Sequence, residues 1–172
     1  MNSEGETPGP APHGGGAARR RAARLAAVQL LYEKETGGGD VEDLIIEQLT
    51  NRPGATFEGG GFAEIDRDLF ADVARGALRR RAQIDGLLGE ALSPRWPINR
   101  LELILAAVLR CGAYELLLRP DVPARAIINE YLEVAHAFFS GDEPGLVNGV
   151  LDRLARRLRP EELHDGGQQR QG

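Results

Sequence analysis

The sequence predicts an all-α protein, and three observations support this class. Apolar residues recur at the three- and four-residue spacing of a helix along most of the chain. No segment alternates apolar and polar residues for the length of a strand. Hydrophobic residues make up 42% of the 172 residues but aromatic residues only 5%, so the core must be aliphatic, which suits packed helices.

Glycine and proline divide the first half of the chain into three helical segments. The first, about residues 18–36, ends at three consecutive glycines, and Asp40 is placed to cap the second. Residues 51–61 are expected to form a loop because they include four glycines and a proline. A long segment follows over residues 62–92, with a break expected at Gly76 or in the arginine run that comes after it.

The second half of the chain predicts three more helices. Residues 99–119 are apolar nearly all round, which is typical of a central, buried helix. Pro123 suits the first turn of the next helix, and Pro144 begins the last one. The tails, residues 1–17 and 160–172, are expected to be disordered or flexible because they are rich in glycine, proline and polar residues.

The charges of the chain include one local anomaly. The net charge is −5, which argues against a broadly basic, nucleic-acid-coating protein. The first helix nevertheless begins with an arginine cluster, defined as Arg19, Arg20, Arg21 and Arg24. A helix amino end carries partial positive charge and disfavours such residues, so we expect an external anion as their partner. The alternative is a solvated run of charge.

The remaining reactive groups predict neither catalysis nor metal binding. Cys111 is the single cysteine, and His136 is the only histidine outside the expected tails. No combination has the spacing of a nucleophile–base pair or a metal site, and no glycine motif for phosphate is present, so no cofactor is expected. The amino end lacks a secretory signal, and the apolar run at residues 101–109 is too short to span a bilayer, so we expect a cytoplasmic protein.

Five motifs, in this order and spacing, carry a resemblance to a known family. They are RRRAARLAAVQLLYE, IDGLLGEAL, LRCGAYELL, DVPARAIINEYLEVAHAF and LVNGVLDRLAR. Together they resemble the NusB family of bacterial transcription antitermination factors. The resemblance implies a NusB-like fold of about seven helices, in which two three-helix bundles pack together. The amino-terminal bundle would span residues 18–92 and the carboxy-terminal bundle residues 99–159 of one domain, residues 18–159.

The resemblance also implies a function. Members of the family bind the boxA element of nascent RNA together with a small-subunit ribosomal protein that doubles as NusE. In the RNA polymerase antitermination complex they promote transcription of ribosomal RNA operons, without catalysis. Some members form homodimers through the surface that their partners use. An alternative class is a helical adaptor that binds only protein, and a third is an enzyme built on His136 and carboxylates.

The resemblance places the expected RNA-binding residues on the first helix. Within the arginine cluster, Arg20, Arg21 and Arg24 match the start of the family's RNA-binding helix, and Arg19 lies beside them. Arginine binds phosphate through its planar fork of donors. Tyr32 follows Arg24 and Val28 at spacings of four residues, so it is expected to share the arginine face and stack on a base. Gln29 is expected to read a base edge. The alternative for Tyr32 is a place in the core.

Further candidates lie outside the first helix. The family's turn at residues 142–146 lies near RNA, so Asp142 and Leu146 are candidate RNA residues, although Gly145 and Leu146 replace a basic residue and a phenylalanine found in other members. For the ribosomal-protein partner, the resemblance indicates Glu102 and Leu105.

Overall fold

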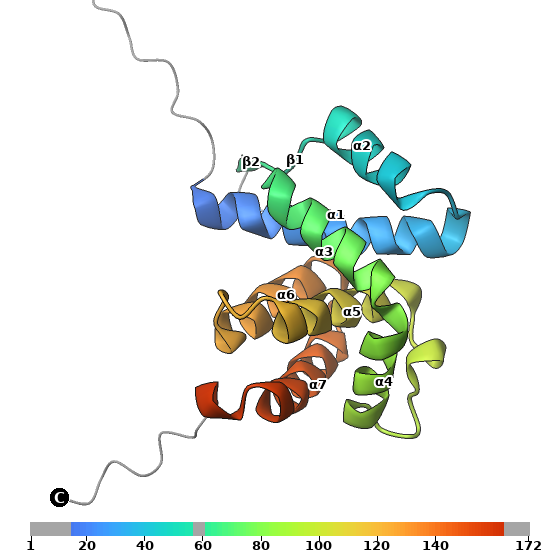
Figure 1. Ribbon diagram of the computed structural model, residues 1–172, viewed down its shortest axis with the longest axis vertical. Helices are drawn as coiled ribbons and strands as arrows, with labels where there is room; N and C mark the ends of the chain where they lie inside the picture. The colour runs from blue at the N-terminus through green and yellow to red at the C-terminus, as the bar shows by residue number, and fades with distance from the viewer. Residues whose placement is uncertain (1–14, 57–60, 164–172) are drawn as a thin grey trace, which may run out of the picture.

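The computed structural model describes residues 15–56 and 61–163, and in that part of the chain it confirms the all-α prediction (Figure 1). The longer elements run in the order α1 (Gly16–Gly37), α2 (Val41–Asn51), β1 (Gly54–Thr56), β2 (Phe62–Glu64), α3 (Arg67–Arg79), α4 (Arg81–Ala91), α5 (Leu103–Leu118), α6 (Ala124–Phe138) and α7 (Glu143–Leu158). Two short 3-10 turns complete it, η1 (Ile98–Arg100) and η2 (Pro160–Glu162).

The boundaries of the first helices follow from their caps. The Asp40 carboxylate accepts hydrogen bonds from the backbone amides of Glu42 and Asp43, at 2.9 and 3.3 Å, as expected for the start of α2. Asp66 caps α3 in the same way, so that helix begins five residues later than the sequence predicted. The break in the long segment falls at Arg80, within the arginine run and not at Gly76.

The chain forms a short antiparallel hairpin, β1–β2, that the sequence did not predict: β1 lies in the expected loop, and β2 lies at the start of the segment expected to be helical. Its register pairs Gly54 with Glu64 and Thr56 with Phe62. Three-residue strands are too short to show an alternating pattern, so the sequence held no strand signal. Gly54 is required there, because a Cβ atom would lie 2.6 Å from the Ala63 carbonyl oxygen and 2.3 Å from Cζ of Phe62.

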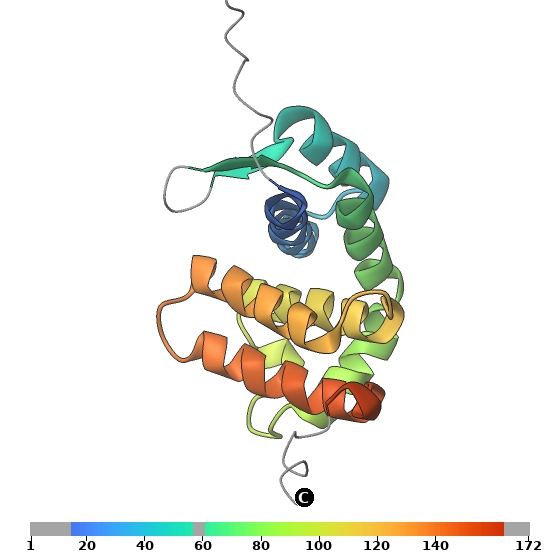
Figure 2. The same ribbon diagram turned by 90° about the vertical axis from the view of Figure 1, so that its left-hand side faces the viewer.

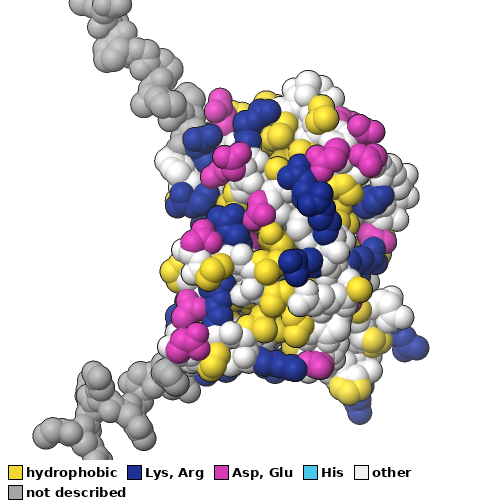
Figure 3. Space-filling view, in the orientation of Figure 1, with side chains coloured by type: hydrophobic (Ala, Val, Ile, Leu, Met, Phe, Trp, Pro, Cys, Tyr) yellow, Lys and Arg dark blue, Asp and Glu magenta, His cyan; other side chains and the backbone are white. Residues whose placement is uncertain are grey.

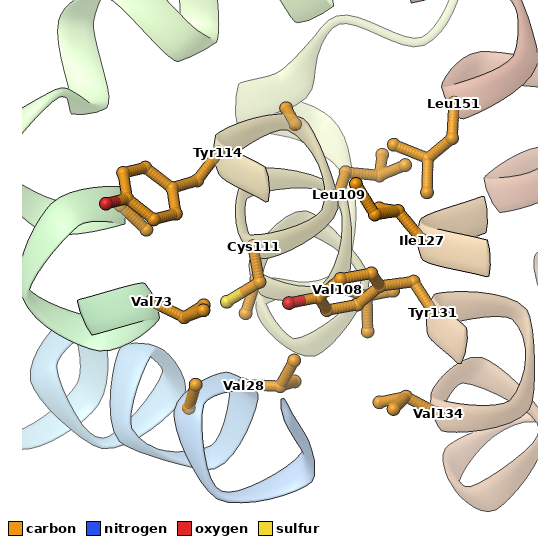
Figure 4. Packing of buried hydrophobic residues seen from close by; sticks show 14 of the residues in the cluster. Val28, Val73, Val108, Leu109, Cys111, Tyr114, Ile127, Tyr131, Val134 and Leu151 are labelled. Atoms are coloured by element: carbon orange, nitrogen blue, oxygen red, sulfur yellow. The ribbon is translucent and has the colours of Figure 1, made fainter. Parts of the chain in front are cut away.

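Helix α5 is the centre of the fold, as its apolar sequence predicted. It packs against α1, α3, α4, α6 and α7. Figure 4 shows Tyr114 directed toward α3, Cys111 toward α1, and Leu109 toward Ile127 of α6 and Leu151 of α7. Every face of the helix is therefore covered by another element.

Two glycines allow helices to approach α5 closely. A Cβ atom on Gly76 would lie 2.2 Å from Cζ of Tyr114, and one on Gly112 would lie 2.8 Å from Cδ1 of Leu151. A glycine inside the last helix also suggests a close helix contact at Gly149. A Cβ atom added there would meet only the Arg153 guanidinium, with Nη1 at 3.5 Å. The close contacts between helices therefore form at Gly76 and Gly112.

The helices form two layers that meet at α1 and α5. Helix α2 and the hairpin lie on one side of α1, and α5, α6 and α7 on the other, while α3 crosses α1 and extends to α5 (Figures 1 and 2). Helix α4 lies against α5 and α7. Helix α1 begins at Gly16, and Leu163, which the sequence assigned to a flexible tail, is buried. The rest of both predicted tails, residues 1–14 and 164–172, lies outside the described residues.

Candidate nucleic-acid interface

The first turn of α1 presents cations that have no carboxylate partner in the described part of the chain. Arg19 and Arg20 are exposed, and neither guanidinium forms an ion pair with a described residue. Gly15 at the helix start provides no side-chain cap, and the first turn contains no acidic residue. The positive end of the helix and the two arginines together favour an anion.

Arg21 is partly compensated. Its Nε and Nη2 atoms each lie 3.3 Å from a carboxylate oxygen of Glu130 on α6. The Arg21 side chain is 42% exposed, so it can still contact a ligand at the surface.

The structure buries the Arg24 side chain beneath the other arginines of the cluster, which corrects the expected surface position. Its side chain is only 4% exposed and forms two hydrogen bonds of 2.9 Å with the carboxylate of Glu115, which is fully buried. Burial opposes the charged form of Arg24, but the hydrogen bond and charge of Glu115 outweigh it and raise the pKa of Arg24. Its donors are thus used inside the protein, and it supports α1 instead of presenting a charge at the surface.

Tyr131 completes the buried site around Glu115. Its hydroxyl donates to Oε2 of Glu115 at 2.5 Å, and burial, followed by the charge of Glu115, raises the pKa of Tyr131 well above its usual value. Glu115 therefore has the polar partners that a buried carboxylate needs. Arg110, the other charged residue of α5, donates to both carboxylate oxygens of Asp85 at 2.8 and 3.1 Å.

The burial of Arg24 changes which residues share the exposed arginine face. Val28 is also buried, so Tyr32 does not continue a surface row that begins at Arg24. The row that reaches the surface is Arg21, Leu25 and Gln29, and these three residues line one groove against α6. Gln29 is therefore beside the arginines as predicted, whereas Tyr32 lies further along the helix.

Tyr32 is 42% exposed and belongs to a second hollow, which we call the Tyr32 hollow. Its lining includes Glu102, Leu103 and Phe138. Glu102 is thus exposed and close to Tyr32. Leu105, the other candidate for a protein contact, is 4% exposed and part of the core, so a direct contact through Leu105 is wrong for this structure. Leu103, 43% exposed, is the leucine that faces the surface.

The two sides of α1 differ in charge. A groove of about 720 Å³ on one side contains Arg20. We call it the acidic groove, because its five carboxylates outnumber its three arginines, Arg20, Arg24 and Arg119. The carboxylates are those of Asp66, Asp68, Asp72, Asp121 and Glu130. Figure 3 shows acidic and basic side chains interspersed around this end of α1. A polyanion is therefore better accommodated on the other side, along Arg21 and Gln29.

That other side is closed by the hairpin, which the sequence pattern does not predict. Thr56 lies opposite α6 in the groove with Arg21 and Gln29. A neighbouring pocket, which we call the hairpin pocket, contains Gln29, Arg52 and Phe62. The glycines and the proline of residues 51–61 indicated a turn, but they could not reveal what flanks it.

Asp142 and Leu146 lie at the start of α7. Asp142 is exposed and precedes the helix, whereas Leu146 is half-buried against the core. Figure 2 shows the hairpin, the carboxyl end of α6 and the α6–α7 connection on the same side of the molecule. Neither residue lines a groove that contains a residue of α1.

The described residues provide little for catalysis. His136 is exposed and shares its groove with Glu133, the one carboxylate of that lining. Residues 15–56 and 61–163 contain no group of three His, Cys, Asp or Glu side chains arranged to hold a metal ion. None of the helices in these ranges is both long and apolar enough to cross a membrane.

Comparison with known proteins identifies close relatives. The model of the NusB family matches residues 21–156. The chain is 48% identical over 142 residues to a transcription antitermination protein NusB of Nitrobacter hamburgensis, covering 83% of this chain and 89% of that protein. It is 46% identical over 158 residues to the protein of the same name from Rhodopseudomonas palustris, covering 91% and 94%.

Solved structures agree with the fold. NusB from T. maritima superposes with a TM-score of 0.69 at 29% identity, covering 83% of this chain and 95% of that one. A chain from the complex of the antitermination factors NusB and NusE with double-stranded RNA gives a TM-score of 0.65 at 21% identity, covering 80% and 96%. At that identity, the second comparison supports the fold alone.

Proposed function

This chain belongs to the NusB family, and from that premise we propose that it is a non-catalytic transcription antitermination factor that binds RNA. The proposed ligand is boxA-type single-stranded RNA in nascent ribosomal RNA transcripts. The proposed partners are the small-subunit ribosomal protein that serves as NusE and, through it, the RNA polymerase antitermination complex. The protein would act in the cytoplasm, where these transcripts are made.

The observation that carries the RNA proposal is the state of Arg19 and Arg20. Both are exposed at the uncapped positive end of α1 and lack a carboxylate partner among the described residues. Phosphate is the anion that arginine binds through its fork of donors. The strand would leave this end along Arg21 and Gln29, on the side of α1 away from the acidic groove.

Two candidates have a secondary place in the proposal. Asp142 carries a negative charge, so it would accept a hydrogen bond from a base or a 2′-hydroxyl and not bind phosphate. Leu146 would contribute only apolar contact. Arg24 acts in this proposal by positioning α1, since its donors are bound to Glu115.

The Tyr32 hollow is the proposed contact for the ribosomal protein. It combines the exposed ring of Tyr32 and the exposed side chain of Leu103 with the carboxylate of Glu102. A half-exposed aromatic residue beside an apolar residue and a charge is typical of protein interfaces. This feature also favours the second candidate function, a protein adaptor without RNA contact, and a homodimer would use the same hollow.

The test is titration of a boxA-like RNA at two salt concentrations, with and without the ribosomal protein. The variant Arg19→Ala/Arg20→Ala should bind more weakly, and its salt slope should fall by about 0.7 for each phosphate that is no longer neutralised. The matched control is Arg95→Ala/Arg100→Ala, which removes two exposed arginines from the α4–α5 connection and should retain the parent slope.

Two results would contradict the RNA proposal. One is equal RNA binding by both double variants, and the other is RNA affinity that the ribosomal protein does not increase. If the charge reversal Arg19→Glu/Arg20→Glu leaves partner binding and antitermination intact, the adaptor function is correct. Sedimentation of the Tyr32→Ala variant would then show whether the hollow serves a homodimer.

A further inference from the structure

The pocket between α1 and the hairpin has the composition of a nucleobase site. The hairpin pocket has a volume of about 450 Å³, within the range of small-molecule sites. Helix α1 contributes Gln29, the end of α2 contributes Asn51 and Arg52, and the hairpin contributes Thr56 and Phe62. We propose that this pocket receives one unstacked base of the bound RNA, an inference that rests on the proposed RNA-binding function.

Phe62 provides the surface on which a base would stack. Its side chain is 45% exposed, a large apolar exposure for a residue at the edge of a two-stranded sheet. The ring is held in place by the opposite strand, since a Cβ atom on Gly54 would lie 2.3 Å from its Cζ atom. A supported and half-open aromatic ring is the platform that single-stranded RNA uses for stacking.

Amide groups around the pocket can read a base edge. Gln29 and Asn51 form no side-chain hydrogen bond to the described residues, so the donors and acceptors of both amides are available. Gln48 lies deeper in the lining and donates from Nε2 to the Arg52 carbonyl oxygen at 2.8 Å. Its Oε1 atom is buried without a partner among the described residues.

The charge of the pocket also suits RNA. Its lining contains one cation, Arg52, and no carboxylate. The Arg52 guanidinium lies 2.8 Å from Glu33 and remains nearly half exposed. The acidic groove on the opposite side of α1, with five carboxylates against three arginines, carries an excess of negative charge and is less favourable for a phosphate chain. Charge therefore selects the hairpin side of the helix.

The pocket lies within reach of the strand proposed above. Arg21 and Gln29 are eight residues apart on α1, which corresponds to about 12 Å along the helix axis. That distance equals roughly three or four nucleotides at a stacked spacing of about 3.4 Å. A strand whose phosphate contacts Arg21 can therefore place a nearby base beside Phe62.

The first test replaces each base of the RNA in turn by an abasic position and measures binding by the parent protein and by Phe62→Ala. We expect Phe62→Ala to weaken binding about 5- to 150-fold without changing the salt slope, because the change removes a neutral stacking surface. At one position the abasic RNA should weaken binding to the parent but not to Phe62→Ala. The matched control is Ile46→Ala, which truncates an exposed apolar residue on α2 and should bind like the parent.

The second test reports contact directly. The chain has a single tryptophan, Trp96, which is 59% exposed on the α4–α5 connection and does not line the pocket. In a Trp96→Phe background, Phe62→Trp should show fluorescence quenching when the RNA binds, and none when the ribosomal protein binds alone. Trp96 in the parent protein should show no change with RNA.

The outcomes separate this inference from the proposed function. If Arg19→Ala/Arg20→Ala loses RNA affinity but Phe62→Ala binds like the parent, the RNA function stands and the base pocket is refuted. The base pocket is also refuted if the loss of affinity from Phe62→Ala adds to the loss from the abasic substitution at every position of the RNA. A fluorescence response of Phe62→Trp to the ribosomal protein alone would refute it too, and would indicate a peptide site. If the parent protein binds no RNA, both proposals fail.

Discussion

The guanidinium of Arg24 and the carboxylate of Glu115 meet in two hydrogen bonds of 2.9 Å, and the two residues are 91 positions apart in the chain. Both side chains are buried, at 4% and 0% exposure. The pair joins α1 to α5, and Tyr131 extends it to α6. These bonds fix the rotation of α1 about its own axis relative to α5, and α1 is the helix that presents the exposed arginines.

We predict that Arg24→Met lowers the free energy of unfolding by about 3–5 kcal/mol, since it leaves a buried carboxylate with only the Tyr131 hydroxyl as partner. The double variant Arg24→Met/Glu115→Leu should lose much less than the sum of its single variants, because no buried charge is left unpaired. Chemical denaturation of the four proteins measures this.

The contradicting outcome is additivity. If the double variant loses the sum of the two single effects, Arg24 and Glu115 do not act as a pair. Arg20→Met serves as the control, because it removes an arginine of the same helix that is exposed, and it should change stability by about 0.5 kcal/mol or less.

We predict opposite effects for two helical glycines. Gly76→Ala should destabilise the protein by about 1–3 kcal/mol, because its Cβ atom would overlap the Tyr114 ring and separate α3 from α5. Gly86→Ala, on α4 with no atom within 4 Å of the added Cβ, should stabilise it by up to about 1 kcal/mol. Thermal unfolding of both variants is the measurement, and a loss of equal size in both would show that the Tyr114 contact is not what requires glycine.

The sequence predicted the helices because their signals are local. Asp40 caps α2 through the amides of the next residues in the chain, and residues 103–118 form a buried helix because nearly every residue in that segment is apolar. Both features are present as expected. The hairpin left no such signal, because its strands are three residues long and are stabilised by pairing with each other and by packing against α1.

The candidate site was only partly predictable, because exposure depends on partners distant in sequence. Arg24, Val28 and Leu31 have the spacing of one buried helix face, and that spacing was the available indication that Arg24 is internal. Leu105 likewise lies on a helix that is apolar all round. The carboxylates that line the acidic groove come from four elements or connections, so no sequence pattern could assemble them.

We predict that stability falls at alkaline pH. Burial, with the hydrogen bond from Tyr114 to Asp72, raises the pKa of Tyr114 to about 12, from a usual value of 10.0. The folded state therefore holds this proton where the unfolded state has released it, so its contribution is complete below about pH 10 and is lost as the pH rises toward 12. Buried Tyr131 has a raised pKa for the same reason and adds to the slope.

Tyr114→Phe tests the assignment. The variant should show a shallower decrease in unfolding free energy between about pH 10 and 12 than the parent, as followed by denaturant titration at several pH values. An identical slope in both proteins would exclude Tyr114 as a source of the pH dependence.

We predict that Arg159 stabilises a helix other than its own. Arginines at the end of α7 are placed to complement that helix's dipole, but Arg159 is buried and donates instead to carbonyl oxygens at the end of α5. Nε donates to Leu116 at 2.9 Å, and Nη2 donates to Glu115 at 2.9 Å and Arg119 at 2.7 Å.

Arg159→Lys should therefore cost about 1–3 kcal/mol of unfolding free energy, although it keeps the charge, because one ammonium group cannot reach carbonyls that the guanidinium bonds from separate atoms. Arg157→Lys is the matched control, since Arg157 is exposed and paired only with Glu90 among the described residues, and it should cost about 0–1 kcal/mol. Hydrogen exchange should locate the loss of protection in Arg159→Lys at the carboxyl end of α5 and at α7. Equal stability of the two lysine variants would show that the charge alone, without the planar fork of donors, is sufficient at this junction.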